Sequence, residues 1–166
     1  VGYIVDSSQL AERYRELQRV VHPDRYASAS ASEKRLSVQG AALINEAYKT
    51  LKDPILRAGY LLSINGIDIR ADNKTTQDAG FLMEQLELRE EMENARKAED
   101  PYAVIAELMV GINKRINILV GQMAVQFEMP NPEQLEAARE MLRKMQFLQK
   151  LRHDAESLEA ELDEVL

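Results

Sequence analysis

The chain has 166 residues, of which 45% are apolar and 30% are charged, so it can bury one or two modest cores and is not intrinsically disordered by composition. No stretch approaches the roughly 18 to 20 consecutive apolar residues of a membrane-spanning helix, so we expect no membrane span. Cysteine is absent, which excludes disulfides and thiol nucleophiles and is compatible with a reducing compartment. With only two histidines, we expect no metal site and no cofactor.

The net charge of -7 is unevenly distributed. Residues 1–70 carry a net charge of +2, and the remainder carries -9. The two halves are therefore expected to bind different partners.

The first helix is predicted from Asp6 onward, because Asp6 is a good N-cap and Gln9 follows at the capping-box spacing. One apolar stripe follows, formed by Leu10, Tyr14, Leu17 and Val21. Pro23 fixes its own φ and disfavours the α region for His22, so this helix should end at Val21 or His22.

A second helix is predicted from about residue 33 to 52, with its packing stripe formed by Leu36, Gly40, Leu43, Ile44, Ala47 and Leu51. The two helices should form an antiparallel hairpin with the His22-Pro23-Asp24 turn at its tip. Asp53 and Pro54 then begin a short helix that Asn65-Gly66 closes.

The turn should expose His22 and Asp24 on either side of a rigid proline. Arg15 and Arg19 lie one turn apart on the face of the first helix opposite its apolar stripe. Two interpretations of these arginines are open. They are either part of a solvated helix face balanced by nearby glutamates, or they attract an acidic partner toward the turn.

A polar linker at 67–75 separates these elements from a helix that is predicted to begin near Thr76. Its core stripe should contain Phe81, Leu88, Met92 and Ala95. A second face mixes apolar and acidic residues: Leu82, Met83, Leu86, Glu87 and Glu90. These residues either widen the core stripe or form a partner surface, and the pattern alone does not distinguish the two.

Two longer helices complete the chain. The first begins at Asp100-Pro101, and its apolar face contains Ile105, Met109, Ile112, Ile116, Leu119, Met123 and Phe127. Asn131 caps the second, whose seam contains Leu148, Leu151, Ala155, Leu158, Leu162 and Val165. The prediction is an all-α protein that ends in an antiparallel three-helix bundle, with Phe147 at the flank of the seam.

Several of these motifs resemble those of a known family. His22-Pro23-Asp24 between two such helices, followed by the run from Ile44 to Leu51 and by Asp53-Pro54, resembles the J-domain of DnaJ-type co-chaperones. The segment from Thr76 to Glu91 is similar to the start of the C-terminal domain of HscB-type J-proteins, which are dedicated to iron-sulfur cluster assembly. The chain departs from the family pattern in three respects: the first J-domain helix is expected to be missing before Val1, Arg25 replaces a commoner lysine, and Asn94 occupies an often acidic position.

The resemblance implies a J-domain at 1–66, the linker at 67–75 and a scaffold-binding domain at 76–166. It also implies a co-chaperone in the bacterial cytoplasm that stimulates ATP hydrolysis by a DnaK-type chaperone of the HscA kind and delivers an IscU-type cluster scaffold to it. The expected chaperone-binding residues are Arg15, Arg19, His22, Pro23, Asp24 and Arg25. The expected scaffold-binding residues are Leu82, Met83, Leu86, Glu87, Glu90 and Phe147.

Other function classes are less well supported by the sequence. His22 and Asp24 are the one acid/base pair of an enzyme hypothesis, but the tip of a hairpin offers no pocket that excludes water. Nucleic-acid binding is opposed by the overall acidity. A J-protein for another client and a non-enzymatic helical adaptor remain as alternatives.

Overall fold

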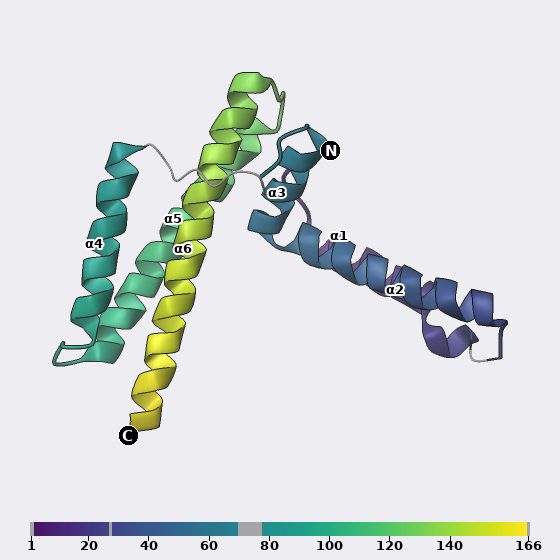
Figure 1. Cartoon of the computed structure of the whole chain (residues 1–166), viewed down its shortest axis with the longest axis horizontal. Helices are drawn as coiled ribbons and strands as arrows, with labels where there is room; N and C mark the ends of the chain where they lie inside the picture. Colours follow the sequence, from purple (N-terminus) through teal and green to yellow (C-terminus); the bar gives the residue numbers. More distant parts are fainter. Residues whose placement is uncertain (1, 27, 70–77, 166) are drawn as a thin grey trace.

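The computed structural model describes residues 2–26, 28–69 and 78–165, and within these ranges it contains helices and no strand. The helices are α1 (Ser7–Val21), the 3-10 helix η1 (Pro23–Tyr26), α2 (Ala31–Lys52), α3 (Pro54–Ile64), α4 (Ala79–Ala95), α5 (Pro101–Gln126) and α6 (Pro132–Val165). Helices α4, α5 and α6 form an antiparallel bundle, and α1 and α2 form a hairpin that projects from the bundle beside α3 (Figure 1). The predicted all-α architecture is confirmed. No described helix is long and apolar enough to span a membrane.

The caps of α1 and α2 account for where the hairpin helices begin and end. The Asp6 carboxylate accepts hydrogen bonds from the backbone N–H groups of Ser8 and Gln9, at 2.8 and 3.0 Å. The helix α1 ends at Val21, directly before the proline turn, as predicted. The helix α2 begins at Ala31, two residues earlier than predicted, because Ser30 and Glu33 form a complete capping box that the prediction overlooked.

The packing stripe predicted for α2 is partly wrong. Leu36, Leu43 and Ala47 are exposed, whereas Gly40, Ile44 and Leu51 are half-buried. At the α1–α2 contact Gly40 lies against Val21, and positions outside the predicted stripe also take part. Ser37 donates a hydrogen bond to the Val21 carbonyl at 2.7 Å, and the Tyr48 ring stacks on Tyr14 with 4.1 Å between centroids. Apolar residues occur on more than one side of α2, so periodicity alone did not identify the side that faces α1.

The helix α3 connects the hairpin to the bundle. The Asp53 carboxylate caps it by accepting from Ile55 N and Leu56 N, and Pro54 occupies its first turn, both as predicted. It ends before Gly66, whose φ of +81° lies in the left-handed region that glycine tolerates.

A continuous core joins α3 to the bundle. Buried apolar residues of α3 and of the first half of α6 belong to one cluster: Ile55, Ala58, Leu61 and Leu62 with Leu135, Ala138, Leu142 and Met145. Tyr3 belongs to the same cluster and stacks on Phe127, with ring centroids 5.8 Å apart. The first 66 residues are therefore attached to the bundle by packed side chains, and Ile67 and Ile69 of the predicted linker add to this contact. The rest of the predicted linker, 70–75, lies outside the described residues.

The core of the bundle follows the predicted stripes closely. Phe81, Leu88 and Ala95 of α4 are buried and Met92 is half-buried. The predicted α5 residues are all buried or half-buried, and so are the seam residues of α6 up to Leu162. The Val165 side chain lies outside the described residues. The helix α4 begins at Ala79, where the Asp78 carboxylate caps it by accepting from Phe81 N at 3.1 Å. The predicted start near Thr76 lies outside the described residues.

Candidate functional site

The polar turn is a single 3-10 helix that is fastened to the end of α1. Pro23 begins η1, which places Asp24 and Arg25 directly after the last residues of α1. The Arg25 guanidinium donates to the Arg19 carbonyl at 2.9 Å, and the Tyr26 hydroxyl donates to the Val20 carbonyl at 3.3 Å. Both contacts satisfy carbonyl groups at the C-terminal end of α1, so they hold the turn in one orientation.

His22 and Asp24 are brought together and remain accessible. The Asp24 N–H donates to His22 Nδ1 at 3.3 Å, so Nδ1 acts as an acceptor. Asp24 Oδ2 lies 3.6 Å from the same nitrogen, and 91% of the Asp24 side chain is exposed. The backbone thus orients the imidazole, while the Asp24 side chain remains accessible to a partner.

The arginines of α1 form an exposed basic face next to the turn. Arg15 and Arg19 are exposed, and among the described residues neither forms an ion pair. Arg13 differs, because its guanidinium contacts Glu16 at 2.8 Å. The two arginines of α1 that were predicted to bind a partner are thus not neutralised by a carboxylate of the described residues.

The mixed face of α4 is a surface and not a widened core. The exposed fractions of Leu82, Met83 and Leu86 are 37%, 60% and 61%, and Glu87 and Glu90 are exposed beside them. The core stripe of α4 accounts for the helix packing without these residues. Exposed apolar side chains rimmed by acids are typical of a protein-binding surface.

Phe147 of α6 lies between two side chains of α4. Its ring meets Phe81 edge to face, with centroids 5.7 Å apart, and the Arg89 guanidinium lies 5.5 Å from its centroid. Half-buried Phe147 therefore connects the core of the bundle to its surface.

Two ion pairs fix α4 to its neighbours. Asp78 forms an ion pair with Lys144 of α6, and Glu84 forms one with Arg115 of α5. The Lys144 ammonium and the helix N–H groups hold the pKa of the Asp78 carboxyl below its usual value. These contacts position the N-terminal half of α4, where the mixed face lies.

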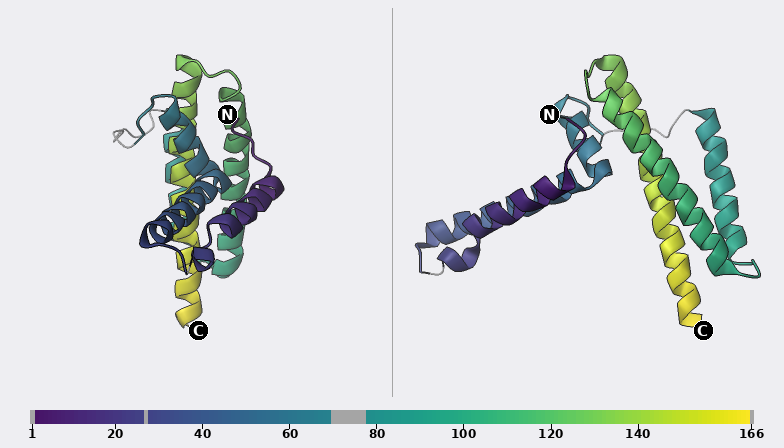
Figure 2. Two further views of the ribbon diagram at one scale, coloured as in Figure 1. Left: turned by 90° about the vertical axis from the view of Figure 1, so that its right-hand side faces the viewer. Right: turned by 180° about the vertical axis from the view of Figure 1, so that it is seen from behind.

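The turn and the mixed face lie far apart in the molecule. The turn is at the end of the hairpin that points away from the bundle, and α4 lies on the side of the bundle opposite α3 (Figures 1 and 2). Two partners can therefore contact the two sites without competing for the same surface. Within the described ranges, no cluster of three or more His, Cys, Asp or Glu side chains could hold a metal ion.

Sequence reasoning missed some residues that position these sites. Asn45 accepts hydrogen bonds from Tyr14 at 2.8 Å and from Gln18 at 2.6 Å, which ties α1 to α2. Arg89 and Lys150 lie beside Phe147, although neither was predicted to belong to the site. The i, i+3 spacing of Phe147 and Lys150 could have indicated a shared surface, but their proximity to Arg89 depends on how α4 packs against α6.

Comparison with known proteins finds relatives that match nearly the whole chain. Residues 77–156 match the family described as the HSCB C-terminal oligomerisation domain. The chain is 41% identical over 162 residues to a co-chaperone protein HscB homolog of Shewanella woodyi, covering 98% of this chain and 93% of the relative. It is also 41% identical to a homolog from Photobacterium profundum, covering 93% and 89% of the two chains.

Two solved structures share the fold. Chaperone HscB from Vibrio cholerae matches with a TM-score of 0.82 and 38% identity, covering 97% of this chain and 93% of the other. Human co-chaperone protein HscB matches with a TM-score of 0.83 and 32% identity, covering 95% and 77%.

Proposed function

The chain belongs to the HscB co-chaperone family, and we propose that it stimulates ATP hydrolysis by an HscA-like DnaK-type chaperone and delivers an IscU-like iron-sulfur scaffold to it. In this role it is an adaptor of the bacterial cytoplasm and does not itself catalyse a reaction. The observation that carries the proposal is the exposed Asp24 carboxylate, presented by a turn whose backbone contacts fix its direction.

The chaperone-binding end would work by charge complementarity. Arg15 and Arg19 would attract an acidic surface of the ATPase domain and raise the rate of encounter, since exposed unpaired charges act mainly on association. Asp24 could then accept a bidentate hydrogen bond from an arginine of the chaperone. His22, Pro23 and Arg25 would position that carboxylate, because they form the turn or fasten it to α1.

The scaffold-binding end would combine apolar contact with a polar rim. Leu82, Met83 and Leu86 present apolar surface, and Glu87 and Glu90 border it. Phe147 lies at the edge of the same surface. Because α3 packs on α6, the two ends belong to one body, and binding both partners raises their effective concentration toward each other.

The test is steady-state ATP hydrolysis by an HscA-like chaperone, with the full-length protein added alone and together with an IscU-like scaffold. We expect stimulation by the protein, a further increase with scaffold, and loss of both with Asp24→Asn. Glu46→Gln is a matched control, because Glu46 is an exposed acid of α2 away from the turn. Circular dichroism of Asp24→Asn should be unchanged.

Each half of the proposal can fail separately. If the wild-type protein gave no stimulation, the chaperone role would be wrong and a non-enzymatic adaptor would take its place. If it stimulated hydrolysis but the scaffold added nothing and did not bind, the protein would be a J-protein for a different client.

A further inference from the structure

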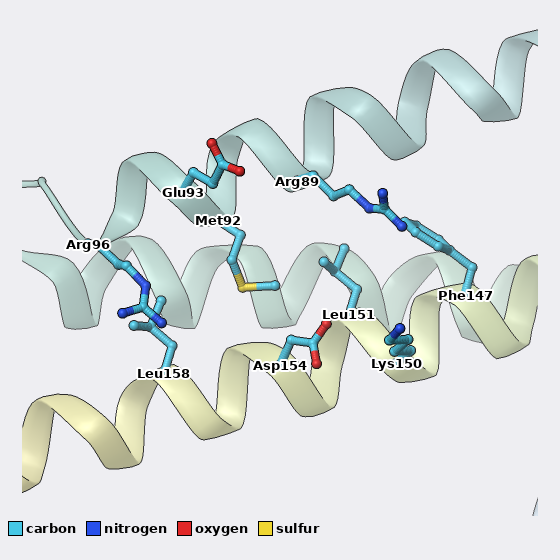
Figure 3. A pocket seen from close by; sticks show the side chains of 9 residues that line it. All are labelled: Arg89, Met92, Glu93, Arg96, Phe147, Lys150, Leu151, Asp154 and Leu158. Carbon is cyan, nitrogen blue, oxygen red and sulfur yellow. The ribbon is translucent and has the colours of Figure 1, made fainter.

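A groove runs between α4 and α6 and begins at Phe147. It has a volume of about 390 Å³ and is lined by Arg89, Met92, Glu93, Arg96, Phe147, Lys150, Leu151, Asp154 and Leu158 (Figure 3). None of these residues except Phe147 belongs to the scaffold-binding set proposed above.

The end of the groove at Phe147 is positively charged. Arg89 and Lys150 are exposed there, and within the described part of the chain neither forms an ion pair. The Arg89 guanidinium lies over the Phe147 ring, 5.5 Å from its centroid. The other end differs, because Arg96 contacts Glu161 of α6 at 2.9 Å. Glu93 and Asp154 lie between the two ends, so the free positive charge is concentrated next to Phe147.

The floor of the groove is apolar. Leu151 and Leu158 of α6 are buried in the bundle core, and half-buried Met92 lies across from them on α4. Figure 3 shows Arg89 extended toward the Phe147 ring above this floor, with Lys150 on the same part of α6 as Phe147. A ligand that matches this end needs an apolar part for the floor and a carboxylate for the two cations.

The groove is continuous with the exposed face of α4. Leu82, Leu86, Arg89 and Glu93 follow one another at spacings of four, three and four residues, so they form one stripe along the helix. The first two members are exposed apolar residues of the proposed scaffold-binding face. The stripe thus leads from that face directly to the basic end of the groove.

We propose that this end of the groove is a second contact for the scaffold, in which an acidic side chain of the scaffold binds Arg89 and Lys150 while a neighbouring apolar side chain packs on Phe147. The inference rests on the proposed function, since it deepens the same binding event. Arg89 and Lys150 form a local positive charge in a domain that is otherwise strongly acidic. An acidic side chain of the scaffold would therefore be attracted to this end of the groove. The Phe147 ring restricts the Arg89 guanidinium before binding, which lowers the entropy lost when the carboxylate arrives.

The experiment measures the dissociation constant of an IscU-like scaffold for the full-length protein and its variants by isothermal titration calorimetry at low and high salt. We expect Arg89→Gln and Lys150→Gln each to weaken binding by roughly fivefold, and each to reduce the dependence of affinity on salt. Lys114→Gln, which removes an exposed charge of α5 outside the groove, should leave both quantities unchanged. Arg89→Lys keeps the charge but not the planar fork, so its affinity should be intermediate.

Leu86→Ala separates this inference from the function on which it rests. If Leu86→Ala weakens binding but Arg89→Gln and Lys150→Gln do not, the α4 face binds the scaffold and the groove contact is wrong. If no variant weakens binding, or the wild-type protein does not bind, the proposed scaffold-binding face is wrong as well. Loss of binding by Arg89→Gln with an unchanged salt dependence would also overturn the ionic contact, because it would indicate altered packing around Phe147.

Discussion

The α1–α2 hairpin and the α3–α6 contact are held together in different ways. In the hairpin helices the only buried residue is Ser37, and the helices are joined by hydrogen bonds around Asn45 and by the Tyr14–Tyr48 stack. At the α3–α6 contact, six residues of α3 are buried and the apolar ones share a core with the bundle. The comparison indicates that the hairpin presents the turn, and that the direction of the hairpin is determined at α3.

The largest expected effect is the loss of a large side chain from the shared core. Leu142→Ala should lower the free energy of unfolding by about 3 kcal/mol, because buried leucines that leave a cavity on truncation cost this much. Leu36→Ala, which removes the same atoms from an exposed position of the hairpin, should change it by less than about 0.5 kcal/mol. Urea denaturation of both variants gives the comparison. Equal effects would mean that the two regions do not differ in packing.

The second prediction concerns Tyr3, which is buried at the junction and donates a hydrogen bond to the Pro54 carbonyl at 3.1 Å. Burial raises its pKa from 10.0 to about 12, an effect that nearby Arg57 opposes. The neutral phenol therefore stabilises the fold below pH 10, and this contribution is lost as the pH rises through 12. The loss should reach about 2.5 kcal/mol at high pH.

The check is the free energy of unfolding of wild type and Tyr3→Phe between pH 8 and 12. Tyr3→Phe should lose stability at pH 8, because its hydrogen bond to Pro54 is missing, and should then fall less steeply above pH 10. If the free energy of unfolding fell equally steeply with pH in both proteins, folding would not raise the pKa of Tyr3, and the prediction would be wrong.

The third prediction tests the charged residue of the junction. Buried Arg57 donates to the Leu51 carbonyl at the end of α2, and its guanidinium lies 4.9 Å from the Tyr3 ring centroid. Arg57→Met keeps much of the volume but removes both contacts, so it should destabilise the protein by about 2 kcal/mol. Thermal unfolding measures this effect, and Arg35→Met, the same chemical change at an exposed position of α2, is the control. If Arg57→Met left the stability of the protein unchanged, the charge of Arg57 would have no structural role.

The smallest expected effect lies within the hairpin. Asn45→Ala removes the acceptor that Tyr14 and Gln18 share, and should cost about 1 kcal/mol because the bonds are exposed to water. Hydrogen exchange should then accelerate in α1 and leave α6 unchanged. Asn117→Ala, an exposed change of the same kind on α5, should have no such effect. Equal acceleration in α6 would contradict the view that these bonds act locally.

Local features of the sequence predicted local structure well. Proline and the side chains of Asp6, Asp53 and Asn131 determine helix ends through contacts within three residues, so most ends were found correctly. For α4 the prediction named no cap, and the structure shows that Asp78 is the capping residue. The core stripes of α5 and α6 were found because each helix has one continuous apolar stripe, and the stripe of α4 was found although a second face of that helix also carries apolar residues.

Contacts between distant elements could not be predicted in the same way. Periodicity indicates that one side of α3 is buried, but it does not identify α6 as the helix that covers it. The same limit applies to the groove, since Arg89 and Phe147 are 58 positions apart in the sequence and meet only through helix packing. The exposure of Met83 and Leu86 likewise depended on which helices cover α4, which is why the sequence left two interpretations open.

The close packing of Gly59 against Ile69 affects the direction of the hairpin. A methyl group at position 59 would lie 2.8 Å from Ile69 Cδ1, so either Ile69 would change its rotamer or α3 would tilt. The α1–α2 hairpin that α3 supports is long, because the 22 residues of α2 extend about 33 Å. A tilt of α3 by roughly 2° would move the far end of the hairpin by about 1 Å. A displacement of this size is enough to disrupt a contact that depends on precise geometry. The direction in which Asp24 is presented therefore depends on the packing of Gly59 against Ile69, at the opposite end of the hairpin from the turn.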